Sequence, residues 1–230
     1  MKRLILLLGA VAMCTTTALA QRIKVGPEIG VNWSKFNVDA RGIDEDDFKM
    51  RPGLKVGGIV DIGFNRMFSF QPGVFFNQKG SRDKYSEGVA MGRRYIDDKY
   101  RINYLELPMN FQLKFGHPYR GQFFIGAGPY LAFAIGGERD WKETVRTNDG
   151  TVVFRDDGDE ELEFGNDDFD DNFRGSDAGL NLNLGFMGPR GFFVRGNAGI
   201  GLANIMPERN DDFSYKNLSL SLTLGMLFGN

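Results

Sequence analysis

Residues 104–135 read YLELPMNFQLKFGHPYRGQFFIGAGPYLAFAI, two runs in which apolar residues alternate with polar or small ones. In the first run the apolar phase begins at Leu105 and returns at every second position up to Phe115. A turn at 116–121 follows, and the second run repeats the pattern from Phe123 to Ile135. Because successive side chains of a strand point to opposite faces, this stretch predicts a long β-hairpin with one apolar face.

The arms of this hairpin are longer than those of an ordinary globular sheet. Strands of globular proteins average about 5–6 residues, whereas a tilted strand that crosses a membrane needs roughly 9–11. No apolar run in the chain reaches the roughly 20 residues that a membrane-spanning helix requires. The hairpin therefore predicts a membrane β-barrel.

The same alternation recurs along the chain and predicts eight strands, at residues 23–34, 54–64, 68–77, 105–115, 123–135, 177–186, 192–202 and 217–228. Short turns follow the second, fourth and sixth strands, whereas the connections at 37–53, 79–100, 137–175 and 205–215 are long and polar. Outer membrane barrels have short periplasmic turns and long extracellular loops. We therefore expect an all-β, eight-stranded antiparallel up-and-down transmembrane β-barrel. A soluble barrel has the same alternation but no reason to sort its connections by length.

Aromatic residues gather near the ends of the expected strands. In outer membrane barrels such residues form girdles at both membrane–water interfaces. We expect Trp33, Phe76, Tyr104 and Phe133 in an outer girdle, and Phe64, Phe68, Phe115, Phe123, Phe186, Phe192 and Phe228 in an inner one.

Phe228 also closes the last alternating strand. A terminal strand that ends on an aromatic residue resembles the signal read by the barrel-insertion machinery, although Gly229 and Asn230 follow here. We predict that Phe228 is a membrane-insertion signal.

The first 20 residues have the features of a secretory signal peptide. Lys2 and Arg3 give a basic start, residues 4–13 are apolar, and a small-residue cleavage site ends at Ala20. We expect cleavage there and one outer membrane β-barrel domain at 21–230, with both ends in the periplasm. The single cysteine, Cys14, lies in the signal, so the mature chain has no disulfide.

In lipid the apolar phase of each strand must face outward, so the polar phase fills the lumen. The candidate structural charges of the lumen are Glu28, Glu106, Lys114 and Arg195. We expect the two glutamates to pair with Arg195 or Lys114, because a buried charge without a partner is costly. An eight-stranded barrel is just wide enough to be filled by side chains, which disfavours a pore.

Composition and charge narrow the function classes. The formal net charge of −2 offers no basic surface for nucleic acid. The only histidine, His117, lies in a short turn, away from the long loops, so we expect no catalytic residues and no enzyme. We expect no cofactor and no metal site either. Carboxylates suit Ca²⁺, but an acidic run without EF-hand spacing is more often a solvated face; the run holds Asp156, Asp157, Asp159 and Glu161.

Three short segments resemble the PorT-like outer membrane β-barrel family of Bacteroidetes: residues 104–108 (YLELP), 126–130 (GAGPY) and 201–205 (GLANI). Residues 177–179 (DAG) and the terminal strand look similar too, while Ala203 stands where the family pattern has Thr. The resemblance covers essentially the mature chain and implies an eight-stranded barrel in the outer membrane. The family's namesake is tied to type IX protein secretion, and most members have no assigned role.

These observations leave two function hypotheses. The first is a non-enzymatic integral outer membrane barrel, structural or accessory to envelope assembly or protein secretion. Its partners would be membrane lipid, the barrel-assembly machinery and other envelope or secretion proteins. The alternative is a surface-binding protein, an adhesin or a protein that captures a ligand or ion through its long loops. Arg93 and Arg94, in the second long loop, are candidates for contact with anionic lipopolysaccharide.

Overall fold

The computed structural model describes residues 22–39, 48–90, 92–165, 172–206 and 214–229. In this part of the chain no helix is long and apolar enough to cross a membrane. The expected signal peptide lies outside the described residues. The nine strands found there are β1 (Arg22–Asp39), β2 (Phe48–Gly63), β3 (Phe68–Val89), β4 (Gly92–His117), β5 (Gly121–Thr147), β6 (Val152–Glu161), β7 (Ser176–Met187), β8 (Phe192–Gly201) and β9 (Ser214–Met226).

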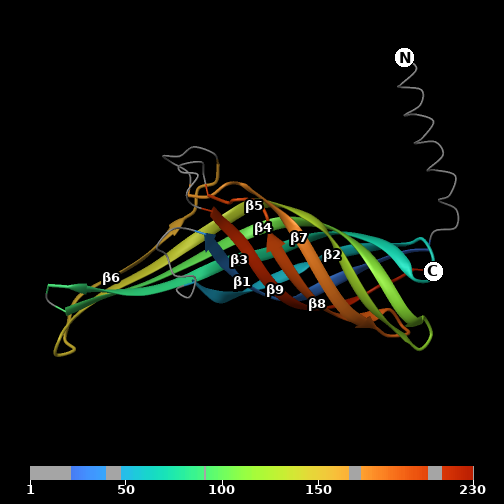
Figure 1. Ribbon diagram of the computed structural model, residues 1–230, viewed down its shortest axis with the longest axis horizontal. Coiled ribbons are helices and arrows are strands. Elements are labelled where there is room, and N and C mark those ends of the chain that lie inside the picture. Colours follow the sequence, from blue (N-terminus) through green and yellow to red (C-terminus); the bar gives the residue numbers. More distant parts are fainter. Residues whose placement is uncertain (1–21, 40–47, 91, 166–171, 207–213, 230) are drawn as a thin grey trace, which may run out of the picture.

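Antiparallel pairing closes eight of these strands into a ring (Figure 1). Neighbours in sequence pair from β1 to β5, β5 then pairs with β7, and β7, β8 and β9 lead back to β1. In the closing pair, Trp33 lies opposite Leu220. The expected all-β, antiparallel closed sheet is confirmed. A ninth strand, β6, was not expected; among the described strands it pairs only with β5 and lies outside the ring.

The alternation seen in the sequence sets the two faces of the ring. Leu222 and Leu184 are 53% and 66% exposed on the outer side, as expected for the apolar phase. The polar phase points inward, where its side chains are buried; among them are Glu28, Asn32, Lys55, Asp61, Asn77, Glu106, Asn181, Arg195 and Thr223.

The aromatic residues divide less simply than we expected. All seven residues of the expected inner girdle are exposed on the outward face. Trp33 and Phe133 are exposed as well, but Tyr104 is fully buried, so its place in the outer girdle was wrong. The reason is parity: Tyr104 lies two residues from Glu106 and therefore shares the inward face.

Two of the expected long loops proved to be strands. β4 and β5 have 26 and 27 residues, far more than the roughly 9–11 that cross a membrane. Their excess length forms a four-stranded antiparallel sheet in the order β3-β4-β5-β6, which leaves the barrel at the left of Figure 1. We call it the protruding sheet; it comprises residues 79–89, 92–102, 137–147 and 152–161.

The polar segments at 79–100 and 137–175 were expected to be loops because they lack an alternating apolar phase. An antiparallel sheet needs none where water covers both faces, since ladder hydrogen bonds and cross-strand side-chain pairs hold it together. The expected loop bounds at 79–100 and 137–175 are therefore wrong for most of their length.

A register shift marks the point where the protruding sheet leaves the ring. Asn103 lies opposite Gly136 and Tyr104 opposite Ala134, so Ile135 is an extra residue in β5. On the outward face of β4, apolar residues run from Phe115 up to Leu105, and the next outward residues are Asn103 and Arg101. The apolar belt of the barrel thus ends at the bulge.

Candidate functional site

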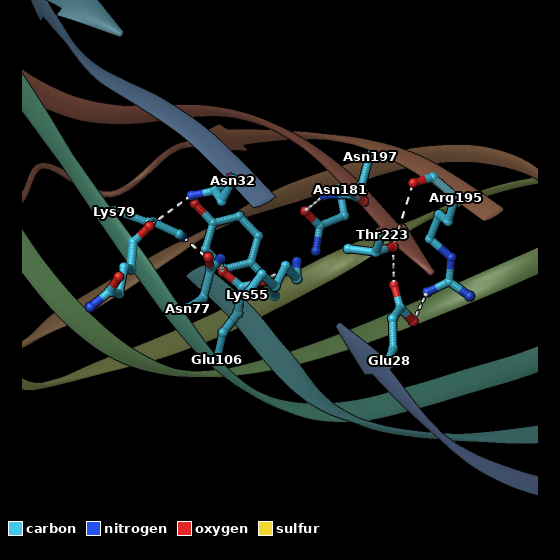
Figure 2. Close-up of polar contacts among 12 residues, drawn as sticks. Glu28, Asn32, Lys55, Asn77, Lys79, Glu106, Asn181, Arg195, Asn197 and Thr223 are labelled. Carbon is cyan, nitrogen blue, oxygen red and sulfur yellow. Dashed lines mark hydrogen bonds and ion pairs between the residues drawn. The ribbon is translucent and has the colours of Figure 1, made fainter. Parts of the chain in front are cut away.

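Lys79 is the centre of a buried charge network in the lumen (Figure 2). Its Nζ lies 2.9 Å from Glu106 Oε2 and 3.2 Å from Asp177 Oδ2, and its side chain is 1% exposed. Lys55 Nζ lies 3.1 Å from the other oxygen of Glu106. The Lys79 ammonium also stands 4.2 Å from the ring centre of Tyr130, which donates a hydrogen bond to Asp177. Two lysines thus neutralise two carboxylates across β2, β3, β4 and β7.

A second group lies farther along the lumen toward the short turns. Arg195 NH1 on β8 lies 3.0 Å from Glu28 Oε2 on β1, and the hydroxyl of Thr223, on the strand between them, donates to the same carboxylate. Lys114 pairs with Asp61 rather than with a glutamate. Arg195 therefore pairs with one of its expected partners, whereas Glu106 takes Lys55 and Lys79. The lumen pairs together join four cations to four carboxylates.

Sequence reasoning missed Lys79 and Asp177 as partners. Lys79 was placed in a loop, although it follows Asn77 by two residues and so continues the inward phase of β3. Asp177 opens β7 on the opposite side of the lumen, 98 residues away. Only the closed ring brings these two side chains together.

Apolar side chains close the lumen on both sides of the charges. The cluster on the short-turn side consists of Ile59, Phe75, Phe124, Met187, Phe193 and Leu227. The cluster on the side of the protruding sheet consists of Phe36, Ile102, Tyr104, Tyr130, Ala132, Leu162, Phe173 and Ile205. Two cavities among the lumen side chains measure about 10 Å³ each, room for one water molecule at most. The expected lumen filled by side chains is found, but it is not polar throughout.

The protruding sheet has two different faces. Its inner face continues the lumen side of the strands. Two arginines lie on this face, Arg94 and Arg139, and each has two carboxylate partners. Arg94 bonds Glu143 at 2.7 Å and Glu87 at 3.1 Å. Arg139 bonds Asp98 and Glu160, both at 3.0 Å. The hydrogen bond from Arg94 lowers the pKa of Glu143.

The outer face continues the outward side of the barrel and carries an open groove of about 490 Å³. Two rows of residues cross the groove, since Lys84, Asp97 and Lys142 lie opposite one another, as do Ser86, Tyr95 and Thr144. Arg146, from the next row toward the tip, also lines the groove. Arg82 donates two hydrogen bonds to Asp97, at 2.6 and 2.7 Å, and these lower the pKa of Asp97.

The acidic run of the third loop lies mainly on β6. Strand alternation divides it, so that Asp156 and Glu160 share one face while Asp157, Asp159 and Glu161 share the other. Within the described ranges no three acidic, histidine or cysteine side chains converge as metal ligands would. Alternation explains why a dense acidic sequence does not gather its carboxylates here.

Phe228 lies just beyond β9, where its backbone exchanges hydrogen bonds of 2.7 and 2.8 Å with Val25. Its side chain is 52% exposed on the outward face, level with the other aromatics of the short-turn end. This position suits an aromatic girdle residue, and the signal role stays a prediction.

Phe228→Ala separates the two roles. If Phe228 is read during insertion, the variant should accumulate unassembled in the periplasm yet fold normally when diluted from urea into detergent. Heat-modifiable gel mobility of both preparations measures this. Cell-derived variant that migrates as folded barrel at the level of the unchanged protein would leave only the girdle role.

Comparison with known proteins gives the same architecture. A family model described as outer membrane protein beta-barrel domain matches residues 17–206. No curated protein matches the chain.

Several solved outer membrane proteins are similar at low identity. Ail, the attachment invasion locus protein of Yersinia pestis, is 12% identical with a TM-score of 0.40, over 90% of this chain and 99% of its own. Neisserial surface protein A is 8% identical with a TM-score of 0.39, over 90% and 97%. CarO2 of Acinetobacter baumannii is 11% identical with a TM-score of 0.40, over 87% and 98%. Since the family model covers most of the sequence, this chain belongs to the outer membrane protein beta-barrel domain family and is an integral protein of the outer membrane.

Proposed function

We propose that this protein is a non-enzymatic surface-binding protein, in which an eight-stranded barrel is a closed anchor and the protruding sheet is the binding part. The short turns would lie in the periplasm and the protruding sheet outside the cell. This develops the alternative that the sequence offered, with a sheet in place of the expected long loops.

The observation that carries the proposal is the contrast between the lumen and the protruding sheet. The lumen holds neutralised ion pairs between two apolar clusters, an arrangement suited to stability rather than to transport. The protruding sheet instead presents side chains to water on both faces. In this sheet β4 continues beyond the apolar belt through residues 92–102, or roughly 36 Å at about 3.3 Å per residue.

The non-enzymatic part of the proposal rests on where the reactive side chains lie. His117 is in the turn between β4 and β5, at the opposite end from the protruding sheet, beside Tyr119. Its ring accepts a hydrogen bond from the backbone N–H of Tyr119, and no nucleophilic side chain among the described residues pairs with it as a catalytic group would.

Labelling of a single cysteine tests the orientation on which the function depends. Asn148 lies at the exposed tip between β5 and β6, and the only natural cysteine is Cys14 in the expected signal peptide. We expect Asn148→Cys to react with a membrane-impermeant maleimide on intact cells. Reaction only after permeabilisation would place the protruding sheet in the periplasm and overturn the proposed function.

Tyr119→Cys is the matched control, because Tyr119 is 81% exposed in the turn at the other end of the barrel. It should react only in permeabilised cells. Labelling of both variants in intact cells would indicate a damaged membrane rather than an orientation.

The resemblance to the PorT-like family supports a second proposal, an accessory role in envelope assembly or protein secretion. With a filled lumen, such a role would act through contacts with other envelope proteins rather than through passage of cargo. A deletion strain tests it: loss of exported proteins from the medium supports the role, and unchanged export contradicts it.

A further inference from the structure

The outer face of the protruding sheet gathers positive charge in a protein whose net charge is −2. From the row of Lys84 to the tip, this face carries five cations and two carboxylates, Asp97 and Asp157; the cations are Lys84, Arg93, Lys142, Arg146 and Arg155. The opposite face balances its arginines with carboxylates. The excess of positive charge is therefore confined to the outer face of the protruding sheet.

Three of these cations have no carboxylate partner in the part of the chain that the structure describes. Asp97 is taken by Arg82, at 2.6 Å, and by Lys84, at 3.5 Å, while Arg155 lies 3.7 Å from Asp157. Among the described residues no carboxylate lies within ion-pair distance of the remaining three, Arg93, Lys142 and Arg146. Positive groups left together on a groove attract an anionic ligand.

The remaining lining of the groove suits a sugar. Tyr95 is 42% exposed, and the guanidinium of Arg146 lies 5.7 Å from its ring centre. Ser86 and Thr144 flank Tyr95 in the same row and add hydroxyl groups that donate and accept hydrogen bonds. An aromatic ring, hydroxyls and cations together match the apolar ring face, the hydroxyls and the acidic groups of a charged saccharide. The volume of about 490 Å³ lies in the range of small-ligand sites.

The geometry points to a binding site for an anionic saccharide, one that carries carboxylate, phosphate or sulfate groups, in the groove lined by Lys84, Tyr95, Lys142, Thr144 and Arg146. This inference deepens the proposed function and rests on it for its biological setting. Asp97 lies eight residues beyond Leu105, the end of the apolar belt, which is roughly 26 Å at about 3.3 Å per residue. The site therefore fits sugars of a polymer above the membrane better than groups at the lipid surface.

Binding to the purified full-length barrel in detergent tests the site, with calorimetry as the readout at physiological salt. The probes are oligogalacturonate, neutral dextran of matched length, and inorganic tripolyphosphate. We expect oligogalacturonate to bind and neutral dextran not to bind. The double variant Lys142→Gln/Arg146→Gln should weaken oligogalacturonate binding about tenfold or more, since hydrogen bonds to charged groups are the strong ones.

Two control variants make the result specific. Lys99→Gln/Arg101→Gln removes the same charge from the same face, from residues outside the groove lining and outside the five cations counted above, and should change binding less than about twofold. Tyr95→Ala should weaken oligogalacturonate binding while leaving tripolyphosphate binding unchanged. Equal losses in both double variants would reduce the site to unspecific charge attraction, and equal effects of Tyr95→Ala on both probes would exclude a saccharide. Heat-modifiable mobility checks that each variant is folded.

A final arm separates the two sources of anionic sugar. Nanodiscs with and without lipopolysaccharide are compared for competition with oligogalacturonate. Oligogalacturonate binding that is the same with and without lipopolysaccharide in the nanodisc supports a site above the membrane. Loss of oligogalacturonate binding when lipopolysaccharide is embedded in the same nanodisc overturns that placement. Suppose that no probe binds, while Asn148→Cys is still labelled on intact cells. That result would overturn the saccharide site and leave the proposed function standing.

Discussion

Lys79→Met is expected to lower the free energy of unfolding by about 3–5 kcal/mol, the usual cost of removing one partner of a buried ion pair. The substitution keeps most of the side-chain volume but leaves Asp177 without its cation and Glu106 with Lys55 alone. Urea unfolding in detergent micelles, followed by tryptophan fluorescence, measures the change.

Lys84→Met serves as the control on the same strand. Its ammonium is on the water-exposed outer face, with a side chain 40% exposed, and such pairs contribute at most about 1 kcal/mol. Adding Asp177→Asn to Lys79→Met should recover a large part of the loss, because the orphaned charge is then removed. Equal stability of the Lys79 and Lys84 variants would show that the lumen network does not hold the barrel together.

Leu222→Arg is expected to lower the free energy of unfolding by about 2–4 kcal/mol in lipid vesicles, since it places a charge against the hydrocarbon. Leu222 is 53% exposed on the outward face of β9, in the middle of the apolar belt. Unfolding in vesicles rather than in micelles gives the larger effect, because micelles adapt around an introduced charge.

Ser221→Ala tests the other face at the neighbouring position. Ser221 is buried toward the lumen, and removing its hydroxyl should change the stability by less than about 0.5 kcal/mol. Similar losses at 221 and 222 would contradict the assignment of the two faces.

The sequence was sufficient where a local rule decides the structure. Alternation along a strand determines which side chains face outward, so Leu184 and Leu222 could be placed outside, and Glu28 and Arg195 inside, without any coordinates. The Tyr104 error came from applying the apolar phase by residue type instead of by parity. A strict count from Glu106 would have avoided it.

The partners of the lumen charges depend on the closed shape and not on any local pattern. Glu28 and Arg195 lie on strands separated by β9, and Lys79 reaches Asp177 across the lumen from β3 to β7. The protruding sheet escaped sequence reasoning for another reason. Its strands are joined by ladder hydrogen bonds and by cross-strand pairs such as Arg94 with Glu143, which lie 49 residues apart in the sequence. Until the register is known, such residues look like those of an ordinary polar loop.

The extra residue, Ile135, changes which residue numbers of β5 face the inner side. Below it the even-numbered residues of β5, such as Tyr130, face the lumen, whereas above it the odd-numbered residues, such as Arg139, share the inner face with Tyr100 of β4. A deletion of Ile135 would remove the bulge and leave Ala134 opposite Tyr104 and the next residue opposite Asn103, so that the upper half of β5 would keep its faces. A deletion of one residue between 137 and 141 that left the bulge in place would instead exchange the faces beyond it and move Lys142 and Arg146 to the inner side. The bulge is thus a place where the joint between the barrel and the protruding sheet can lose one residue without exchanging the faces of either part.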